Sequence, residues 1–412
     1  MTTVNKLRNA CVRLFFLLRK ADYTPLILLW AVAAFYCALC PFIHKSIVGG
    51  SGYYTYTLQA LAWRDGKFYL EQDYPWLELA VYQGHWYISF PPVPSIPLFF
   101  LTFLFGSNTP DNLLVKLYVA AGCIGIYYML RGAGYGKGAS AAFSLLCSLA
   151  GSLLSITSEG AVWYQAQTLA FGLTAVSTAA MYLKRPTLSL SLYALAVGCR
   201  PFNAVFGVFL FALYISQCAA QKTPFKKAFC RLLPGLVIGF LIACAYGWYN
   251  YIRFGNIFEF GHNYLPEFSW QGGVQFSLKS IPQNLQNFLL RMPFSWDGSQ
   301  WQLNQFGFCF LIANPALALM LIWMLWDAFH HRFTWVKGVL LLCFLIQLFL
   351  LLMHRTFGGF QFGARYTCDL LPYPAVYLAL KGHARKIHGA EMLILIAALA
   401  FAVYGFVTMS LG

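Results

Sequence analysis

The stretch TPLILLWAVAAFYCALCPFI, residues 24–43, contains twenty residues and no charge. A helix of that length extends about 30 Å, which is roughly the thickness of the hydrocarbon core of a bilayer. The stretch therefore predicts a membrane-crossing helix. Similar apolar runs follow along the rest of the chain, so this first run indicates the class of fold.

Composition supports the same interpretation. The chain has 412 residues, of which 59% are hydrophobic and 10% charged, and its mean hydropathy is +0.61. A soluble domain carries about 25% charged residues. So few charges leave too little polar surface to face water, and lipid must be the main solvent. We predict one all-α integral membrane domain over residues 1–412.

Eleven further apolar segments predict about 11–12 transmembrane helices. The segment 93–106 is short and begins among Pro91, Pro92, Pro94 and Pro97. If it slants or re-enters the bilayer there are eleven crossings, and if it spans there are twelve. The segments lie near 93–106, 112–130, 139–157, 166–183, 187–199, 202–217, 232–250, 306–326, 336–353, 369–380 and 391–411.

The net charge of +15 lies in short basic clusters between the apolar runs. Such clusters are typical of cytoplasmic loops that face anionic headgroups. No single basic face can form, which argues against nucleic-acid binding. Residues 5–20, NKLRNACVRLFFLLRK, predict an amphipathic helix on the cytoplasmic headgroups. Placing the clusters inside puts two long aromatic segments outside, the first external loop at 44–92 and the second at 251–305.

Metal, disulfide and nucleotide motifs are missing from the sequence. The 12 cysteines are scattered, and Cys37 and Cys40 share one apolar run. This pattern predicts buried thiols rather than a disulfide framework. The histidines lie in different segments without paired ligand spacing, and no Walker motif occurs. We expect no protein metal site and no nucleotide hydrolysis.

Acidic residues are scarce, and the first external loop contains Asp65, Glu71, Asp73 and Glu78 among many aromatic residues. Carboxylates beside a membrane suit a polar substrate that is carried on a lipid. The alternative is an interfacial loop whose acids are simply solvated. Composition leaves both interpretations open.

Several ionisable residues fall at membrane depth or at helix ends. Arg200 precedes Pro201, while Arg365 and Asp369 lie in one stretch near the C-terminus. Such groups are functional candidates because an unpaired charge in lipid is costly. The arginine fork suits a phosphate. Asp369 follows Arg365 by four residues, so we expect an ion pair on one helix face that orients Arg365.

Five stretches, in order along residues 24–380, resemble a known family. They are ELAVYQGHWY (78–87) with FPPVP (90–94), WYQAQ (163–167), VGCRP (197–201), YNYIRFGNIFEFG (249–261) and FGGFQFGARYTCDLLP (357–372). They are similar to stretches of bacterial polytopic glycosyltransferases with the C-type (GT-C) fold. Relatives of that family include protein O-mannosyltransferases and aminoarabinose transferases.

The resemblance implies a GT-C-like multi-helix bundle in the bacterial cytoplasmic membrane, with interfacial helices in the first external loop. It implies inverting sugar transfer at the external face, from a polyprenyl-phosphate sugar to a glycan, lipid or protein acceptor. We expect Glu78 as the catalytic base, with Asp73 second. The expected donor-phosphate ligands are Arg365, Arg200, Arg253 and His85, and the expected supporting residues are Asp369, Tyr87 and Tyr366. The resemblance leaves open whether a divalent cation helps to hold the phosphate.

One departure from the family keeps other functions open. Members usually place an acid just after the first crossing, where this chain reads HKSIVGGSGYY at 44–54. The base must then be Glu78, Asp73 or Glu71. The alternatives are a lipid-linked-sugar flippase or transporter and a non-catalytic lipid-binding protein of the cell envelope. Internal repeats would favour a transporter, and none is evident.

The positive-inside pattern yields a labelling prediction. Cysteines introduced near residues 60 and 280 should react with a membrane-impermeant thiol reagent on intact cells. Both positions lie in segments that we place outside. Protection of both sites from the reagent would contradict the topology.

Overall fold

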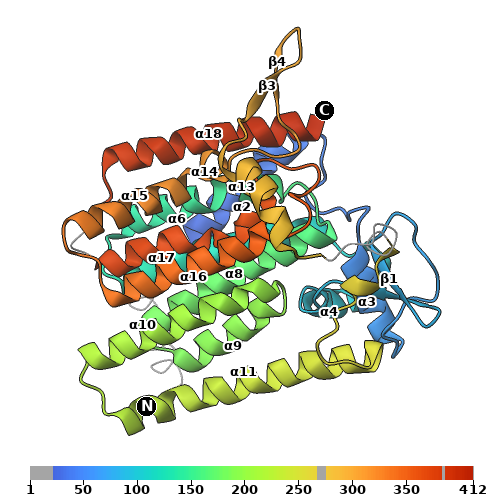
Figure 1. Ribbon diagram of the computed structural model, residues 1–412, viewed down its shortest axis with the longest axis horizontal. Coiled ribbons are helices and arrows are strands. Elements are labelled where there is room, and N and C mark those ends of the chain that lie inside the picture. The colour runs from blue at the N-terminus through green and yellow to red at the C-terminus, as the bar shows by residue number, and fades with distance from the viewer. Residues whose placement is uncertain (1–21, 267–274, 383–385, 412) are drawn as a thin grey trace, which may run out of the picture.

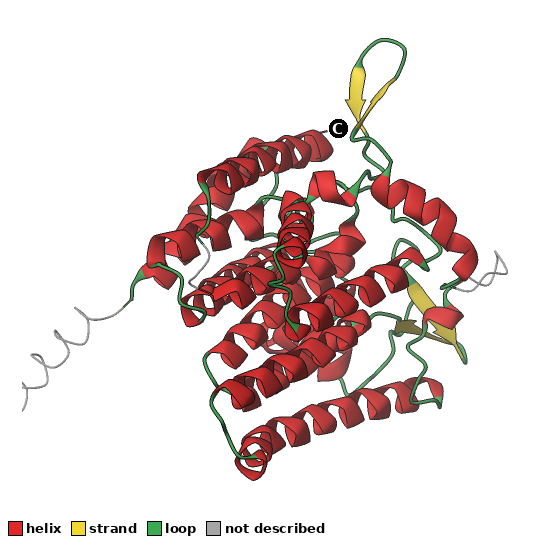
Figure 2. Cartoon of the chain, turned by 60° about the vertical axis from the view of Figure 1, so that its left-hand side comes forward, coloured by secondary structure: helices red, strands yellow, loops and turns green. Residues whose placement is uncertain are grey.

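The computed structural model describes residues 22–266, 275–382 and 386–411. The helix predicted over 5–20 lies outside the described residues. The described chain forms a bundle of helices that run side by side, and short irregular elements gather at one end of it (Figure 1, Figure 2). We call this the loop end. It carries residues 44–92 and the segment that follows α11.

Each apolar segment predicted from the sequence contains a helix. Within the described residues, six spans are long and apolar enough to cross a membrane: Thr24–Phe42, Asp111–Gly132, Pro201–Ala220, Phe225–Phe254, Trp335–Leu352 and Gly389–Leu411. The all-helical membrane fold is thereby confirmed, and the chain is a multi-pass membrane protein. The helices are α2 (Thr24–Phe42), α4 (Ser95–Phe105), α5 (Asp111–Gly132), α6 (Lys137–Leu149), α8 (Val162–Tyr182), α9 (Pro186–Val197), α10 (Phe206–Ala220), α11 (Phe225–Phe254), α15 (Pro315–Phe329), α16 (Trp335–Leu352), α17 (Pro372–Lys381) and α18 (Gly389–Leu411).

Helix α4 lies alongside α3 (Thr55–Arg64) at the loop end (Figure 1). Near the start of α3, the Ser95 hydroxyl donates to the carbonyl of Tyr56 at 3.1 Å. At its other end, Arg64 donates to the carbonyl of Thr102 at 2.6 Å. Because α4 follows α3 from end to end, it belongs with the first long loop. This arrangement favours eleven crossings over twelve.

The first long loop also contains a β-hairpin. Strand β1 (Leu79–Tyr82) pairs with the antiparallel strand β2 (His85–Ile88). The turn residues Gln83 and Gly84 both have positive φ, at 49° and 79°, which matches the twist that two-residue hairpin turns require. From the sequence, the apolar neighbours Leu77 and Leu79 suggest a partly buried helix around Glu78. That prediction is wrong, because Glu78 directly precedes β1. Strand alternation and a Gln-Gly turn override the helical interpretation.

The second long segment supplies further short elements at the loop end. A second hairpin projects beyond the bundle (Figure 1, Figure 2). Helix α13 lies against the end of α16, where Asn284 donates to the carbonyl of Leu352 at 2.9 Å. The elements of this segment are η3 (His262–Tyr264), η4 (Leu278–Ser280), α13 (Ile281–Leu289), β3 (Phe294–Trp296) and β4 (Trp301–Leu303). The remaining short elements are η1 (Gly106–Asn108), α7 (Ser152–Ser155), η2 (Pro201–Val205), α14 (Phe310–Ala313) and η5 (Arg365–Leu370).

Close packing of α5 and α8 fixes the centre of the bundle. A Cβ on Gly125 would lie 2.8 Å from the backbone nitrogen of Val176, and one on Gly172 would lie 2.7 Å from the carbonyl oxygen of Tyr118. Small residues at such crossings let helix backbones approach closely in a membrane. The start of α8 is therefore held firmly at the loop end, where it carries Trp163 and Tyr164.

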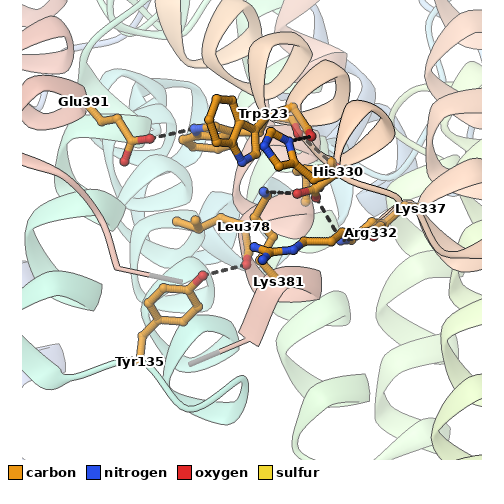
Figure 3. A network of polar contacts seen from close by, with 11 residues as sticks. Tyr135, Trp323, His330, Arg332, Lys337, Leu378, Lys381 and Glu391 are labelled. Atoms are coloured by element: carbon orange, nitrogen blue, oxygen red, sulfur yellow. Dashed lines mark hydrogen bonds and ion pairs between the residues drawn. The ribbon is translucent and has the colours of Figure 1, made fainter. Parts of the chain in front are cut away.

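The end opposite the loop end is held together by a buried carboxylate. Asp327 of α15 is bonded to Lys337 of α16 at 2.9 Å and to Lys381 of α17 at 2.7 Å. The hydroxyl of Tyr377 also donates to Asp327 at 2.7 Å. Figure 3 shows the two lysines converging between these helices. Two cations and one anion thus join three helix ends.

Replacing Asp327 with alanine should destabilise the protein by roughly 3–5 kcal/mol, because two buried ammonium groups would lose their counter-charge. The expected result is a lower thermal unfolding midpoint in detergent. Glu71→Ala is the matched control, because it removes the partner of Lys67 in an exposed ion pair and should change the midpoint little. Equal midpoints for the two variants would argue against the stabilising role of Asp327.

Candidate functional site at the loop end

Four segments that are distant in sequence meet at the loop end. Gln167 of α8 donates to the carbonyl of Arg365 in η5 at 2.7 Å. The backbone nitrogen of Val162, at the start of α8, donates to the carbonyl of Tyr53 in the first long loop at 3.2 Å. Arg200, between α9 and η2, reaches η5 through Asp369. These contacts define the candidate site.

Arg200 and Asp369 form a two-pronged ion pair. The Arg200 Nε donates to Asp369 Oδ2 at 2.9 Å and to Oδ1 at 3.2 Å, and Nη2 lies 2.9 Å from Oδ2. The Asp369 side chain is 0% exposed, whereas that of Arg200 is 23% exposed. The carboxylate thus fixes the guanidinium, and one edge of the arginine stays accessible.

The pair corrects an expectation from the sequence. We expected Asp369 to pair with Arg365 through four-residue spacing on one helix face. Residues Arg365–Leu370 instead form the 3-10 helix η5, which has about three residues per turn, so positions four apart do not face each other. Asp369 therefore points to Arg200, and it supports a different arginine from the one predicted.

Arg365 lies in an aromatic setting. Its guanidinium carbon is 5.3 Å from the ring centre of Trp163, 6.0 Å from that of Tyr164 and 5.3 Å from that of Tyr366. Its Nε is buried and has no hydrogen-bond partner among the described residues. A buried N–H left unbonded is costly. A cation with an unused buried donor is a natural ligand for an incoming anion.

Glu78 contacts the same indole through the ring N–H. The Trp163 Nε1 donates to Glu78 Oε2 at 3.2 Å, while the Trp163 ring contacts Arg365. Glu78 is half-buried between the buried residues Leu77 and Leu79. One tryptophan therefore links a carboxylate and a guanidinium that are far apart in sequence.

The other two acids considered for the base lie away from this tryptophan. Asp73 is exposed on the loop that precedes Glu78. Glu71 is exposed too and pairs with Lys67. Among the acids of the first long loop, Glu78 is thus the one that the described contacts bring to the arginine.

Two histidines lie close to these arginines. The His354 ring is 4.9 Å from the Tyr366 ring, and the His262 ring is 6.0 Å from Phe90. Burial, followed by electrostatic repulsion from the nearby His354, Arg200 and Arg253 when His262 is protonated, lowers the pKa of His262 to about 4. Burial and the nearby Arg200 and Arg365 also lower the pKa of His354. Both imidazoles stay neutral near pH 7, in a region with excess positive charge.

Three of the predicted site residues lie elsewhere. Arg253 is 3% exposed and donates to the carbonyl of Ile88 at 2.7 Å and to Asn250 at 3.0 Å. It thereby fastens the first hairpin to the end of α11. His85 is exposed on that hairpin and packs on Tyr69, with ring centres 4.2 Å apart. Tyr87 is buried against Phe254. The described contacts of these three residues are within the first long loop and with the end of α11, and not with Arg200 or Arg365.

Sequence reasoning missed Asp111 at the start of α5. Asp111 is 0% exposed, and its Oδ1 accepts the backbone N–H of Ser51 at 2.9 Å. Its Oδ2 has no hydrogen-bond partner among the described residues. Ser51 lies in the stretch 44–54 that lacks an acid of its own, so the fold brings one there. The signal was an acid directly before a long apolar run.

Glu159 was missed as well. It lines a cavity of about 120 Å³ together with Tyr164 and Gln361, and Gln361 in turn accepts the backbone N–H of Arg365 at 2.8 Å. Gln361 therefore contacts Arg365 and lines the same cavity as Glu159. Within residues 22–266, 275–382 and 386–411, no three His, Cys, Asp or Glu side chains converge as metal ligands.

Comparison with known proteins gives a match in structure alone. No family model matches the chain, and no curated protein matches it. The oligosaccharyltransferase of Archaeoglobus fulgidus, tethered to an acceptor peptide by a disulfide bond, aligns with a TM-score of 0.50 and 14% identity over 95% of this chain and 55% of that chain. Its apo form aligns with a TM-score of 0.48 and 14% identity over 95% and 56% of the two chains. Its complex with an inhibitory peptide and a dolichol-phosphate aligns with a TM-score of 0.46 and 13% identity over 94% and 56%.

The alignment bears on the fold. At 14% identity it shows that the chain has the GT-C-like arrangement of helices. The chain spans about half the length of the archaeal protein that it matches, 55% in the tethered form. The expectation of a GT-C-like helical bundle is confirmed.

The histidine environment predicts a pH-dependent affinity for anions. A phosphate bound beside His262 would stabilise its protonated form, so the pKa would rise above about 4 and the complex would take up a proton. By linkage, the affinity for a lipid phosphodiester, whose own charge is constant, should increase as the pH falls from about 7 to about 5. Binding titrations in detergent would measure this change.

His262→Gln should flatten that pH dependence. His85→Gln, on the exposed hairpin, should leave it unchanged and serves as the control. A pH dependence that survives in His262→Gln would show that another group takes up the proton.

Proposed function

We propose that this chain is a glycosyltransferase that transfers a sugar from a polyprenyl-phosphate donor at the external face of the bacterial cytoplasmic membrane. The observation that carries this proposal is the Glu78–Trp163–Arg365 arrangement. Trp163 donates to Glu78 and contacts Arg365 with its ring. A carboxylate that can accept a proton and a guanidinium whose Nε has no hydrogen-bond partner among the described residues thus contact the same tryptophan.

In this proposal Arg365 is the principal ligand of the donor phosphate. Its buried Nε lacks a partner among the described residues, so a phosphate oxygen would satisfy a donor that is otherwise costly to bury. The guanidinium fork matches phosphate geometry better than an ammonium group does. The contacting rings Trp163, Tyr164 and Tyr366 exclude water and strengthen the attraction.

Arg200 supplies a second, fixed positive charge. Asp369 holds its Nε and Nη2, and its guanidinium lies 5.9 Å from the centre of the Tyr366 ring. Because Arg365 contacts the same ring at 5.3 Å, the two cations flank one tyrosine. The pair preorganises the charge that the leaving phosphate needs, and Asp369 acts as a positioning residue.

The reaction then requires one base and one stabilised leaving group. Glu78 accepts the proton of the acceptor hydroxyl as its oxygen attacks the anomeric carbon of the sugar. The bond between that carbon and the phosphate oxygen breaks, and the polyprenyl phosphate leaves with the electron pair. Arg365 and Arg200 stabilise the charge that develops on it. A single displacement from the opposite face inverts the anomeric configuration.

The shared fold is consistent with this class of reaction. The tethered archaeal neighbour is named as an oligosaccharyltransferase bound to an acceptor peptide. This chain covers about half of that protein, so its acceptor is proposed only as a glycan, lipid or protein. The sugar is proposed as a hexose or pentose, and a divalent cation is a candidate helper at the phosphate.

Substitutions at two residues separate donor binding from chemistry. Glu78→Gln should reduce sugar transfer by about 10²–10⁴-fold, the usual contribution of a base, and should leave polyprenyl-phosphate binding unchanged. Arg365→Ala should lose donor binding, and Arg365→Lys should lose much of it because the fork is lost. Transfer would be measured in membrane vesicles with a panel of radiolabelled polyprenyl-phosphate pentoses and hexoses.

Asp73→Asn is the control for Glu78→Gln, because it removes an exposed acid from the same loop. Full transfer by Glu78→Gln would contradict the assigned base, and a parallel Asp111→Asn variant would then show whether the buried acid takes that role. Full lipid affinity in Arg365→Ala would contradict the phosphate site. Donor binding without any transfer by the wild type would favour a flippase or a non-catalytic lipid-binding protein.

A further inference from the structure

A basic hollow lies at the opposite end of the bundle from the arginine site. It has a volume of about 860 Å³ and is located where α8 turns into α9, where α10 ends and where α11 begins (Figure 1). Its lining combines cationic, polar and apolar side chains. The lining residues are Lys184, Arg185, Pro186, Thr187, Leu188, Ser191, Gln221 and Arg231.

The described residues that line this hollow carry positive charge without a negative one. Lys184 and Arg185 come from the α8–α9 turn and Arg231 comes from α11, and no acid is among the lining residues. Residues 160–258 contain no Asp or Glu at all. Thr187 and Gln221 add a hydroxyl and an amide donor beside the cations, while the Ser191 hydroxyl donates to the carbonyl of Thr187 at 2.9 Å. Three cations with neighbouring polar donors are the groups that bind phosphate oxygens.

The surroundings of the hollow place it at a lipid surface. Helix α11 carries an apolar span of which 11% is buried within the protein. Leu188 and Leu233 are 44% and 41% exposed beside the cations. Toward the membrane interior α9 and α11 touch, because a Cβ on Gly235 would lie 3.0 Å from the Cα of Thr187. The hollow therefore has a closed floor and an apolar flank that suits acyl chains.

We propose that this hollow binds the headgroup of an anionic phospholipid of the cytoplasmic leaflet. The lipid phosphate would contact Lys184, Arg185 and Arg231, and its acyl chains would run along the exposed face of α11. Basic pockets between transmembrane helices on the cytoplasmic side are known to hold such headgroups. The site is independent of the sugar-transfer proposal, since none of its residues belongs to the loop end.

The test compares two triple variants with the same change in charge. One is Lys184→Gln/Arg185→Gln/Arg231→Gln, which empties the hollow of its cations. The control is Lys222→Gln/Lys226→Gln/Lys227→Gln, which removes exposed cations from the same end outside the lining. Both variants change exposed side chains, and equal thermal unfolding midpoints would verify that they fold. Arg231→Gln alone provides a milder version.

Binding of phosphatidylglycerol and phosphatidylcholine would be measured by native mass spectrometry of the full chain in detergent. The wild type and the control should retain phosphatidylglycerol preferentially. The hollow variant should lose about 10- to 100-fold of that affinity, because each cation near an anionic lipid contributes about a factor of five. Polyprenyl-phosphate binding at the other end should be unchanged.

Two outcomes would overturn the proposal. Equal losses in both triple variants would show a diffuse effect of surface charge rather than a site. Displacement of the lipid by inorganic phosphate or glycerol phosphate at similar concentrations would identify a soluble phosphate as the ligand. Retention of phosphatidylglycerol by the wild type and the control alone, without such displacement, supports the lipid site.

Discussion

A lipid environment leaves charged side chains few places to lie, and this constraint shapes the structure. An ionisable group in the bilayer must be paired, reach water or face other protein. Asp327 follows the first option, between Lys337 and Lys381. At the other end Arg200 is paired with Asp369. These two ion-paired groups thus lie at opposite ends of the bundle.

The loop end can hold a site because its backbone is irregular yet bonded. Non-helical backbone near membrane depth is tolerated only where protein satisfies its polar groups. Asn314 does this for three short elements, since its Oδ1 accepts from the backbone of Ser152 at 2.9 Å and its amide donates to Phe310 at 3.1 Å and Thr367 at 3.3 Å. These bonds hold η5 in place, and with it Arg365 and Asp369. The Nε of Arg365 is buried and has no hydrogen-bond partner among the described residues, which supports the proposal that it binds a phosphate oxygen.

Apolar periodicity and length were enough to predict the helices. Each apolar run contains a helix, because in lipid the helix is the structure that satisfies its own backbone. The arginine and glutamate candidates Arg365, Arg200 and Glu78 were also found from the sequence, since charges are rare enough to be weighed one by one. All three lie in the cluster at the loop end, whereas their roles in binding and catalysis are still predictions.

The pairings could not be predicted, for physical reasons. The partner of Asp369 depends on η5 being a 3-10 helix, which four-residue spacing does not reveal. The setting of Glu78 depends on a hairpin rather than a helix. Asp111 was overlooked because its importance comes from Ser51, sixty positions away in sequence, and only the folded chain brings the two together. Arg253 and His85 lie in stretches that resemble the family. In the structure Arg253 is buried and His85 is exposed, and both belong to the first hairpin and its contacts rather than to the arginine cluster.

We propose that the end of the bundle bearing η5 binds a lipid-linked phosphate beside a carboxylate. The most direct test is an experimental structure of the full chain with polyprenyl phosphate. We expect a phosphate oxygen within hydrogen-bond distance of the Arg365 guanidinium, with Arg200 still paired to Asp369 and Glu78 facing the sugar position. A phosphate bound elsewhere, with the Arg365 Nε still unbonded, would contradict it.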